Sequence, residues 1–172
     1  MSLSILSNAE IKSMFAYRWP RMCLDSSFWE IKKYINQNPY NCWSEVKFER
    51  KNYYALNNLD GQQGIYMFVA KPNNLFTKHQ TFILYVGETK NLKQRFQKYF
   101  TYANSKHPSD QKKRRMVLVW KKYLYFNYYT TSFKTREDRK NAEYDLIDSI
   151  VPPMNDDFRS KILSAKKKAL EF

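Results

Sequence analysis

Two apolar runs, each carrying one of the chain's few glycines, constrain the fold most strongly. The first opens with Gly-Ile-Tyr at 64–66, the second closes with Tyr-Val-Gly at 85–87, and only three glycines occur in 172 residues. Alternation of side chains along the first run predicts a strand, with Tyr66 on the face opposite to its neighbours. A second strand is predicted over 80–86, and a loop of about ten residues between them favours an antiparallel hairpin. Glycines this scarce mark backbone that takes a positive φ or approaches another group closely.

A helix is predicted directly after the second run, with Thr89 as its N-cap. Leu92, Phe96 and Tyr99 recur at the spacing of one helical face and are expected to face a core. Arg95 lies at the edge of this apolar face. An arginine there either extends its head group into solvent or points into a cleft, and spacing alone favours solvent.

Three further segments complete the predicted elements. The apolar run at 116–120 fits a helix or a strand equally well. Residues 123–131 are dense in tyrosine, phenylalanine and threonine, which predicts a third strand. The last helix is expected to begin at a capping sequence, Thr-Arg-Glu-Asp at 135–138, and to end at Val151 before two prolines.

Glu143 is the candidate for chemistry on this last helix. Leu146, Ile147 and Ile150 follow it at helical spacing, so the carboxylate is expected within the apolar face. Burying a carboxylate there is costly unless it is paired, protonated or bound to a metal. The residues alone leave two alternatives open, a buried ion pair with Arg95 and a metal site.

These elements predict an α/β fold of the α+β type, with a small central sheet of about three strands, largely antiparallel and flanked by helices. Residues 59–158 are expected to form the domain. Residues 1–58 are predicted as a mostly helical N-terminal extension, with helices near 9–17 and 28–35, acting as a cover on the domain or as a substrate-binding arm. Residues 159–172 form a basic C-terminal tail.

Positive charge is concentrated in one part of the chain. The sequence has 30 Lys and Arg against 16 Asp and Glu, and eleven basic residues against two acidic ones fall between 88 and 122. This excess predicts a polyanionic partner such as DNA, although a solvated lysine-rich surface and a membrane surface would also fit. No apolar run approaches about 18 residues, which excludes a membrane-spanning helix. The expected nucleic-acid contacts are Lys90, Lys93, Lys98, Lys112, Lys113, Arg114 and Arg115.

The cysteines and histidines do not predict a zinc site. Cys23 and Cys42 are too few, and too far from His79 and His107, for the spacing of zinc ligands. The N-terminus lacks the basic and apolar segments of a secretory signal. We therefore expect an intracellular, cytoplasmic protein with reduced thiols.

The two glycine tripeptides resemble those that give the GIY-YIG endonuclease family its name, with valine at position 86 in place of isoleucine. The rest of the family pattern follows in order, and the resemblance covers about residues 61–158. The matching positions are Tyr66, Tyr85, Arg95, Tyr99, Glu143 and Asn155.

This resemblance implies an endonuclease that hydrolyses phosphodiester bonds of DNA, with duplex DNA as the expected substrate and a divalent metal as cofactor. Glu143 is the implied metal ligand, for Mg²⁺ or Mn²⁺, and a single carboxylate suits Mg²⁺ when waters and phosphate oxygens complete its shell. Arg95 is the implied phosphate ligand, because its charged fork matches two oxygens. The alternative is a catalytically inactive nucleic-acid-binding module of the same fold, and a structural RNA-associated protein is a third possibility.

The resemblance also gives roles to the remaining positions. Tyr66 is implied as the general base or water-orienting group, with Tyr85 and Tyr99 as its hydrogen-bonding partners. Asn155 would donate to phosphate or position a neighbour. Glu88 departs from the pattern, because family members in nucleotide-excision repair carry lysine there. It argues against a repair-type incision domain, while recognition sequence, oligomeric state and DNA versus RNA stay open.

Overall fold

The computed structural model describes residues 43–71, 81–130, 133–161 and 164–165. The predicted helices near 9–17 and 28–35 therefore lie outside the described residues, as does most of the basic tail. Within the described part of the chain, no helix is long and apolar enough to cross a membrane.

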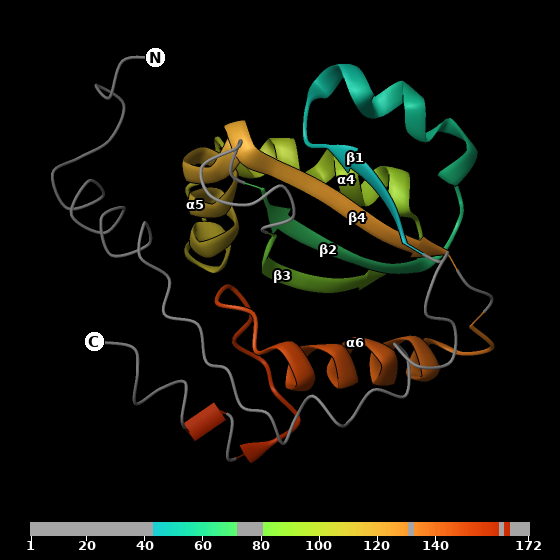
Figure 1. Ribbon diagram of the computed structural model, residues 1–172, viewed down its shortest axis with the longest axis vertical. Helices are drawn as coiled ribbons and strands as arrows, with labels where there is room; N and C mark the ends of the chain where they lie inside the picture. Colours follow the sequence, from blue (N-terminus) through green and yellow to red (C-terminus); the bar gives the residue numbers. More distant parts are fainter. Residues whose placement is uncertain (1–42, 72–80, 131–132, 162–163, 166–172) are drawn as a thin grey trace, which may run out of the picture.

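A four-stranded antiparallel sheet forms the centre of the domain (Figure 1). Its order is β1-β4-β2-β3, so β3 is an edge strand. The predicted hairpin is confirmed as β2 and β3, and the predicted third strand is β4. The strands are β1 Ser44–Lys47, β2 Gly64–Ala70, β3 Phe82–Thr89 and β4 Leu124–Thr130.

Close approach explains the two glycines of the hairpin. Gly87 lies opposite Tyr66 in the β2–β3 pairing, and a Cβ added to Gly87 would overlap the Tyr66 ring. A Cβ on Gly64 would overlap the backbone oxygen of Tyr129 on β4. Only hydrogen is small enough at either position. Gly61 is the one that needs a positive φ, at 74°.

One face of the sheet is covered by three helical elements. They are η2 Arg50–Leu59, α4 Leu92–Tyr102 and α5 Gln111–Trp120, and the ambiguous run at 116–120 is therefore helical. Phe68 and Phe126 from the sheet pack against Phe96 and Tyr99 of α4 in the larger core cluster. The predicted apolar face of α4 is thus confirmed. Short 3₁₀ turns at Pro108–Asp110 and Lys121–Tyr123 flank α5.

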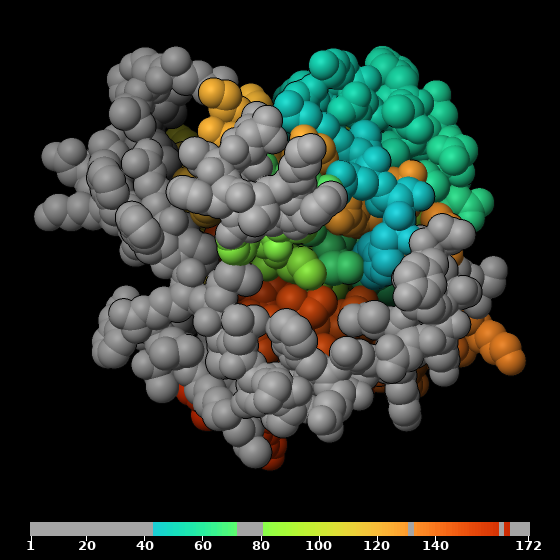
Figure 2. Space-filling model, viewed as in Figure 1, coloured from blue at the N-terminus to red at the C-terminus, as the bar shows by residue number. Residues whose placement is uncertain are grey.

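The opposite face of β2 and β3 is covered by α6, Arg136–Ile150 (Figure 1). Thr135 and Asp138 form the predicted capping box, and Val151 ends the helix in the left-handed conformation with φ of 51°. Leu146 and Ile147 pack with the sheet in a second core cluster. In the space-filling view, orange-red atoms of the C-terminal part of the domain are visible directly below the green atoms of the sheet (Figure 2).

Two expectations differ from the structure. Residues 44–58, assigned to the N-terminal extension, contain a strand that was not predicted: β1 pairs with β4, and Leu56 is buried in the larger core. The N-cap of α4 is Asn91, whose side chain accepts a hydrogen bond from the Gln94 amide, and not Thr89. Thr89 is still paired with β2, because β3 continues two residues beyond Gly87.

Candidate active site

A cavity of about 520 Å³ opens between α6, the start of α5 and the outer edge of β3. Three elements far apart in the sequence therefore meet at one place. The sequence-predicted residues that line it are Tyr85, Lys112, Lys113, Arg115, Glu143 and Asn155. Lys140, Tyr144 and Asp156 also line it and were not predicted.

Glu143 is buried at the wall of this cavity, at 8% exposure. Its Oε2 has no hydrogen-bond partner among the described residues, although Nζ of Lys140 lies 3.2 Å away. Burial raises the pKa of Glu143, and the charge of Lys140 opposes this rise. The ion pair with Arg95 that the sequence left open does not form, since Lys140 of the same helix supplies the neighbouring charge.

Three tyrosines from the predicted set gather beside Glu143. The hydroxyls of Tyr66 and Tyr99 are 3.1 Å apart, and both side chains are buried. The Tyr85 ring lies 6.1 Å from that of Tyr66 and 6.2 Å from that of Tyr99, between centroids. Burial raises the pKa of Tyr85, and the charge of Glu143 adds to this; hydrogen bonding to Tyr99 and Tyr66 and the charge of Arg95 oppose it.

Tyr66, the expected general base or water-orienting group, does not line the cavity. Tyr66 and Tyr85 share the sheet face that points toward α4, but Tyr66 is only 1% exposed. Its hydroxyl meets that of Tyr99, and its ring packs against Phe126 at 5.3 Å between centroids. Burial raises its pKa well above the ordinary value. Tyr85 lines the cavity that Glu143 lines, so the placement favours Tyr85 for that role.

Arg95 lies among these tyrosines, with its guanidinium carbon 6.0 Å from the centroid of the Tyr66 ring. It is half-buried on α4 and is not among the residues that line the cavity. Burial lowers the pKa of Arg95, but the surrounding tyrosines outweigh this effect and raise it. Its fixed charge therefore acts on the hydroxyl cluster.

Asn155, expected to donate to phosphate or to position a neighbour, lines the cavity and is bonded to the backbone of β3. Its Oδ1 accepts a hydrogen bond from the Val86 amide, and its Nδ2 donates to the Val86 carbonyl, both at 2.9 Å. Beside it, the Met154 amide donates to the Leu84 carbonyl at 3.0 Å. The segment after α6 thus supplies hydrogen-bond partners for backbone groups on the outer edge of β3, next to Tyr85.

The match to a family model decides the identity of this arrangement. The model of the GIY-YIG catalytic domain matches residues 62–154, which is more than half of the chain. This chain belongs to the GIY-YIG family. The two glycines of the motif are those whose hydrogens make room for Tyr66 and for the backbone of Tyr129.

Among solved structures, the chain is similar to the GIY-YIG N-terminal endonuclease domain of UvrC from Thermotoga maritima, a point mutant bound to its catalytic divalent cation. The identity is 18%, the match covers 62% of this chain and 97% of that chain, and the TM-score is 0.38. No curated protein matches the chain.

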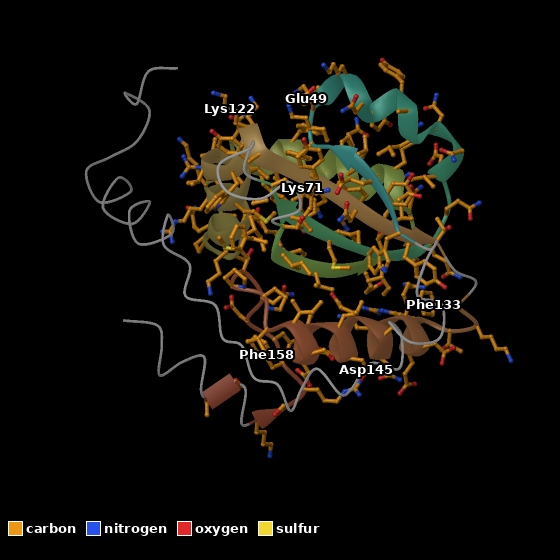
Figure 3. All side chains as sticks on the ribbon, in the orientation of Figure 1. Glu49, Lys71, Lys122, Phe133, Asp145 and Phe158 are labelled. Carbon is orange, nitrogen blue, oxygen red and sulfur yellow. The ribbon has the colours of Figure 1, made fainter. Side chains whose placement is uncertain are left out.

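Glu88, which follows the second glycine of the GIY-YIG motif, is neutralised within the protein. Arg139 of α6 donates from Nε to its carboxylate at 2.5 Å and from Nη1 to Oε1 of Gln63 at 2.7 Å. Gln63 in turn donates to the carbonyl of Phe133, which lies just before α6 (Figure 3). Arg139 is only 3% exposed and was not predicted. The one sequence signal was its position, one helical turn before Glu143 on the same face.

The basic residues of the GIY-YIG domain separate into distinct groups. Lys93 interacts locally, 3.6 Å from Asp60 and 4.9 Å from the centroid of the Tyr53 ring. Lys90 and Lys98 are exposed and do not line the cavity. Of the expected nucleic-acid contacts, only Lys112, Lys113 and Arg115 line the cavity, and all three lie on α5.

Proposed function

We propose that this protein is a divalent-metal-dependent endonuclease that hydrolyses phosphodiester bonds of DNA. The observation that carries the proposal is a buried carboxylate, Glu143, facing a basic cavity beside Tyr85 within a GIY-YIG domain. A buried carboxylate among lysines and an arginine suits a site that handles both a cation and phosphate.

The residues fit a cation held by one protein carboxylate. Among the described residues, no group of three or more His, Cys, Asp and Glu side chains is arranged to hold a metal, so a site built wholly from protein ligands is not supported there. Glu143 offers an oxygen ligand with an Oε2 that lacks a hydrogen bond within the described chain. Mg²⁺ commonly takes one or two carboxylates and completes its shell with waters and phosphate. A divalent cation held by Glu143 would polarise the phosphate and offset its developing charge.

Tyr85 is the residue we assign to the attacking water. A tyrosine is a weak base at neutral pH, and burial raises the pKa of Tyr85 further. Its hydroxyl is therefore neutral in the resting protein and orients a water by hydrogen bonding. Arg95 and the hydroxyls of Tyr66 and Tyr99 oppose the pKa shift, so they favour the tyrosinate form, which could take a proton from the water directly.

Nicking of supercoiled plasmid tests the proposal. We expect open-circular product with Mg²⁺ or Mn²⁺ and none with EDTA, and a single site cuts one strand at a time. Binding of plasmid without metal-dependent cleavage would contradict the proposal and favour the inactive binding module. Cleavage that continues in EDTA would contradict the metal dependence.

A further inference from the structure

The side chains of the four basic residues Lys-Lys-Arg-Arg at 112–115 do not all point toward the cavity. Lys112, Lys113 and Arg115 line the cavity with Glu143. Arg114 instead donates from Nε to the carbonyl of Ala103 at the end of α4, at 3.4 Å. Successive residues of a helix point about 100° apart, so a run of four like charges is divided by the helix itself.

The two long walls of the cavity differ in charge. The α5 wall carries three positive side chains, and the first residue of α5, Gln111, borders the same space, so the helix dipole adds to the positive potential. The α6 wall carries Lys140 and Tyr144 beside Glu143. The negative catalytic group therefore lies opposite a positive wall, which would hold a polyanion with one phosphate near Glu143.

Asp156 lies in the same cavity and pairs with Lys112. Both side chains are partly exposed, and exposed pairs are weak, so phosphate can replace the carboxylate at low energetic cost. Asp156 thus occupies the position of an anion on the α5 wall when nucleic acid is absent.

We propose that the α5 wall is the phosphate-binding surface of the enzyme: Lys112, Lys113 and Arg115 contact the phosphates that flank the scissile bond, Asp156 is displaced from Lys112 on binding, and Arg114 takes no part. This inference rests on the proposed function for the nature of the substrate. It assigns backbone contacts, which hold a strand in position without reading its sequence.

Salt dependence of DNA binding tests the proposal directly. Each variant is made in a Glu143→Gln background and measured in EDTA, so that no cleavage interferes. The ligand is a fluorescein-labelled 30-base-pair duplex of arbitrary sequence, titrated at several KCl concentrations over roughly 50 to 200 mM. Replacing Arg115 or Lys113 by glutamine should reduce the slope of log K against log salt by about 0.9, the value for one lost phosphate contact on duplex DNA.

Two charge-matched variants act as controls. Arg114→Gln removes the same charge one residue away along α5. Lys122→Gln removes a charge from the 3₁₀ turn that follows α5, at the end of α5 that lies away from α6 (Figure 3). Both should leave the slope unchanged. If Arg114→Gln lowers it as much as Arg115→Gln, or if none of the cavity variants changes it, the proposal is overturned.

The Asp156 part of the proposal has its own test. Asp156→Asn should tighten binding by about two- to fivefold, the effect expected from removing an exposed competitor. In a Lys112→Gln background, the same change should give no gain, because the two residues act as a pair. An equal gain in both backgrounds would contradict displacement.

These outcomes are separable from those of the nicking experiment. A protein that nicks plasmid but shows unaltered salt slopes would refute the α5 wall and leave the endonuclease standing. A protein that binds through α5 but never nicks would refute the endonuclease and leave the binding surface standing. The unfolding temperature of each variant shows whether a loss of binding reflects unfolding instead.

Discussion

At the scale of single residues, Tyr85 and Glu143 are coupled through their charges. The ionised carboxylate of Glu143 raises the pKa of Tyr85, and burial raises the pKa of both groups. The buried pair of Tyr66 and Tyr99 lies behind them, with the positive charge of Arg95 beside it. The candidate catalytic groups therefore belong to one buried cluster that opens at the cavity through Tyr85 and Glu143.

Replacing Tyr85 by phenylalanine should lower single-turnover cleavage by about 10²- to 10⁴-fold, the usual contribution of a general acid or base. DNA affinity should stay unchanged, because the phosphate contacts are assigned to other residues. Tyr66→Phe is the matched control and should cost less activity, while destabilising the protein through loss of the buried hydrogen bond to the hydroxyl of Tyr99. A larger loss in Tyr66→Phe than in Tyr85→Phe would return the role to Tyr66.

Glu143→Gln should stabilise the metal-free protein near neutral pH. Burial raises the folded-state pKa of Glu143 above its ordinary value of 4.5. A group with a raised pKa contributes stability below the unfolded value and loses it as pH rises through the folded pKa. Thermal unfolding of both proteins across this window measures the effect. The unfolding temperature of the variant should rise relative to that of the wild type as pH increases. The opposite change in relative unfolding temperature would contradict the burial argument.

At the scale of elements, the outer edge of β3 depends on the segment that follows α6. Asn155 replaces a neighbouring strand there, with both amide groups bonded to Val86. Asn155→Ala should lower the free energy of unfolding by about 1 to 3 kcal/mol, because two buried backbone groups lose their partners. Urea denaturation measures this change. Asn141→Ala, on the exposed side of α6, is the control, and an equal loss in both variants would show that Asn155 has no special part.

The contact between Arg139 and Glu88 fixes α6 against the end of β3. Arg139→Met should cost about 3 to 5 kcal/mol of unfolding free energy, because it leaves a largely buried carboxylate without its partner. Glu88→Gln combined with Arg139→Met should recover much of this loss, since it removes the remaining charge. If the double variant is less stable than Arg139→Met alone, the unpaired charge is not the cause.

At the scale of the whole molecule, the sequence was most informative where the deciding interactions are local. The hairpin follows from alternation, and α6 follows from its capping box and its apolar spacing. β1 escaped prediction because four residues show no period and are held by pairing with β4, some eighty residues later. Whether an element forms through such distant contacts is not visible in its own residues.

In the candidate site, too, features set by local sequence were predicted and features set by distant contacts were not. The burial of Glu143 follows from helical spacing, and Asn155 was found through the family pattern. The pairing of Glu88 with Arg139, and the turn of Arg114 away from the cavity, depend on how α5 and α6 pack against other elements. Strand alternation predicted the face on which Tyr66 lies, but not that α4 covers that face.

The most direct test of the central claim is the single-turnover cleavage rate of Glu143→Gln in Mn²⁺, measured beside Glu137→Gln. Glu137 is an exposed acid in the first turn of the same helix, so this variant makes the identical chemical change away from the cavity. Glu143→Gln should lose at least about a thousandfold in rate, because several kcal/mol of transition-state stabilisation depend on the metal site. It should stay folded and bind DNA, while Glu137→Gln cleaves at the wild-type rate. A Glu143→Gln protein that cleaves within about tenfold of the wild type would contradict the claim that this carboxylate is the centre of the reaction.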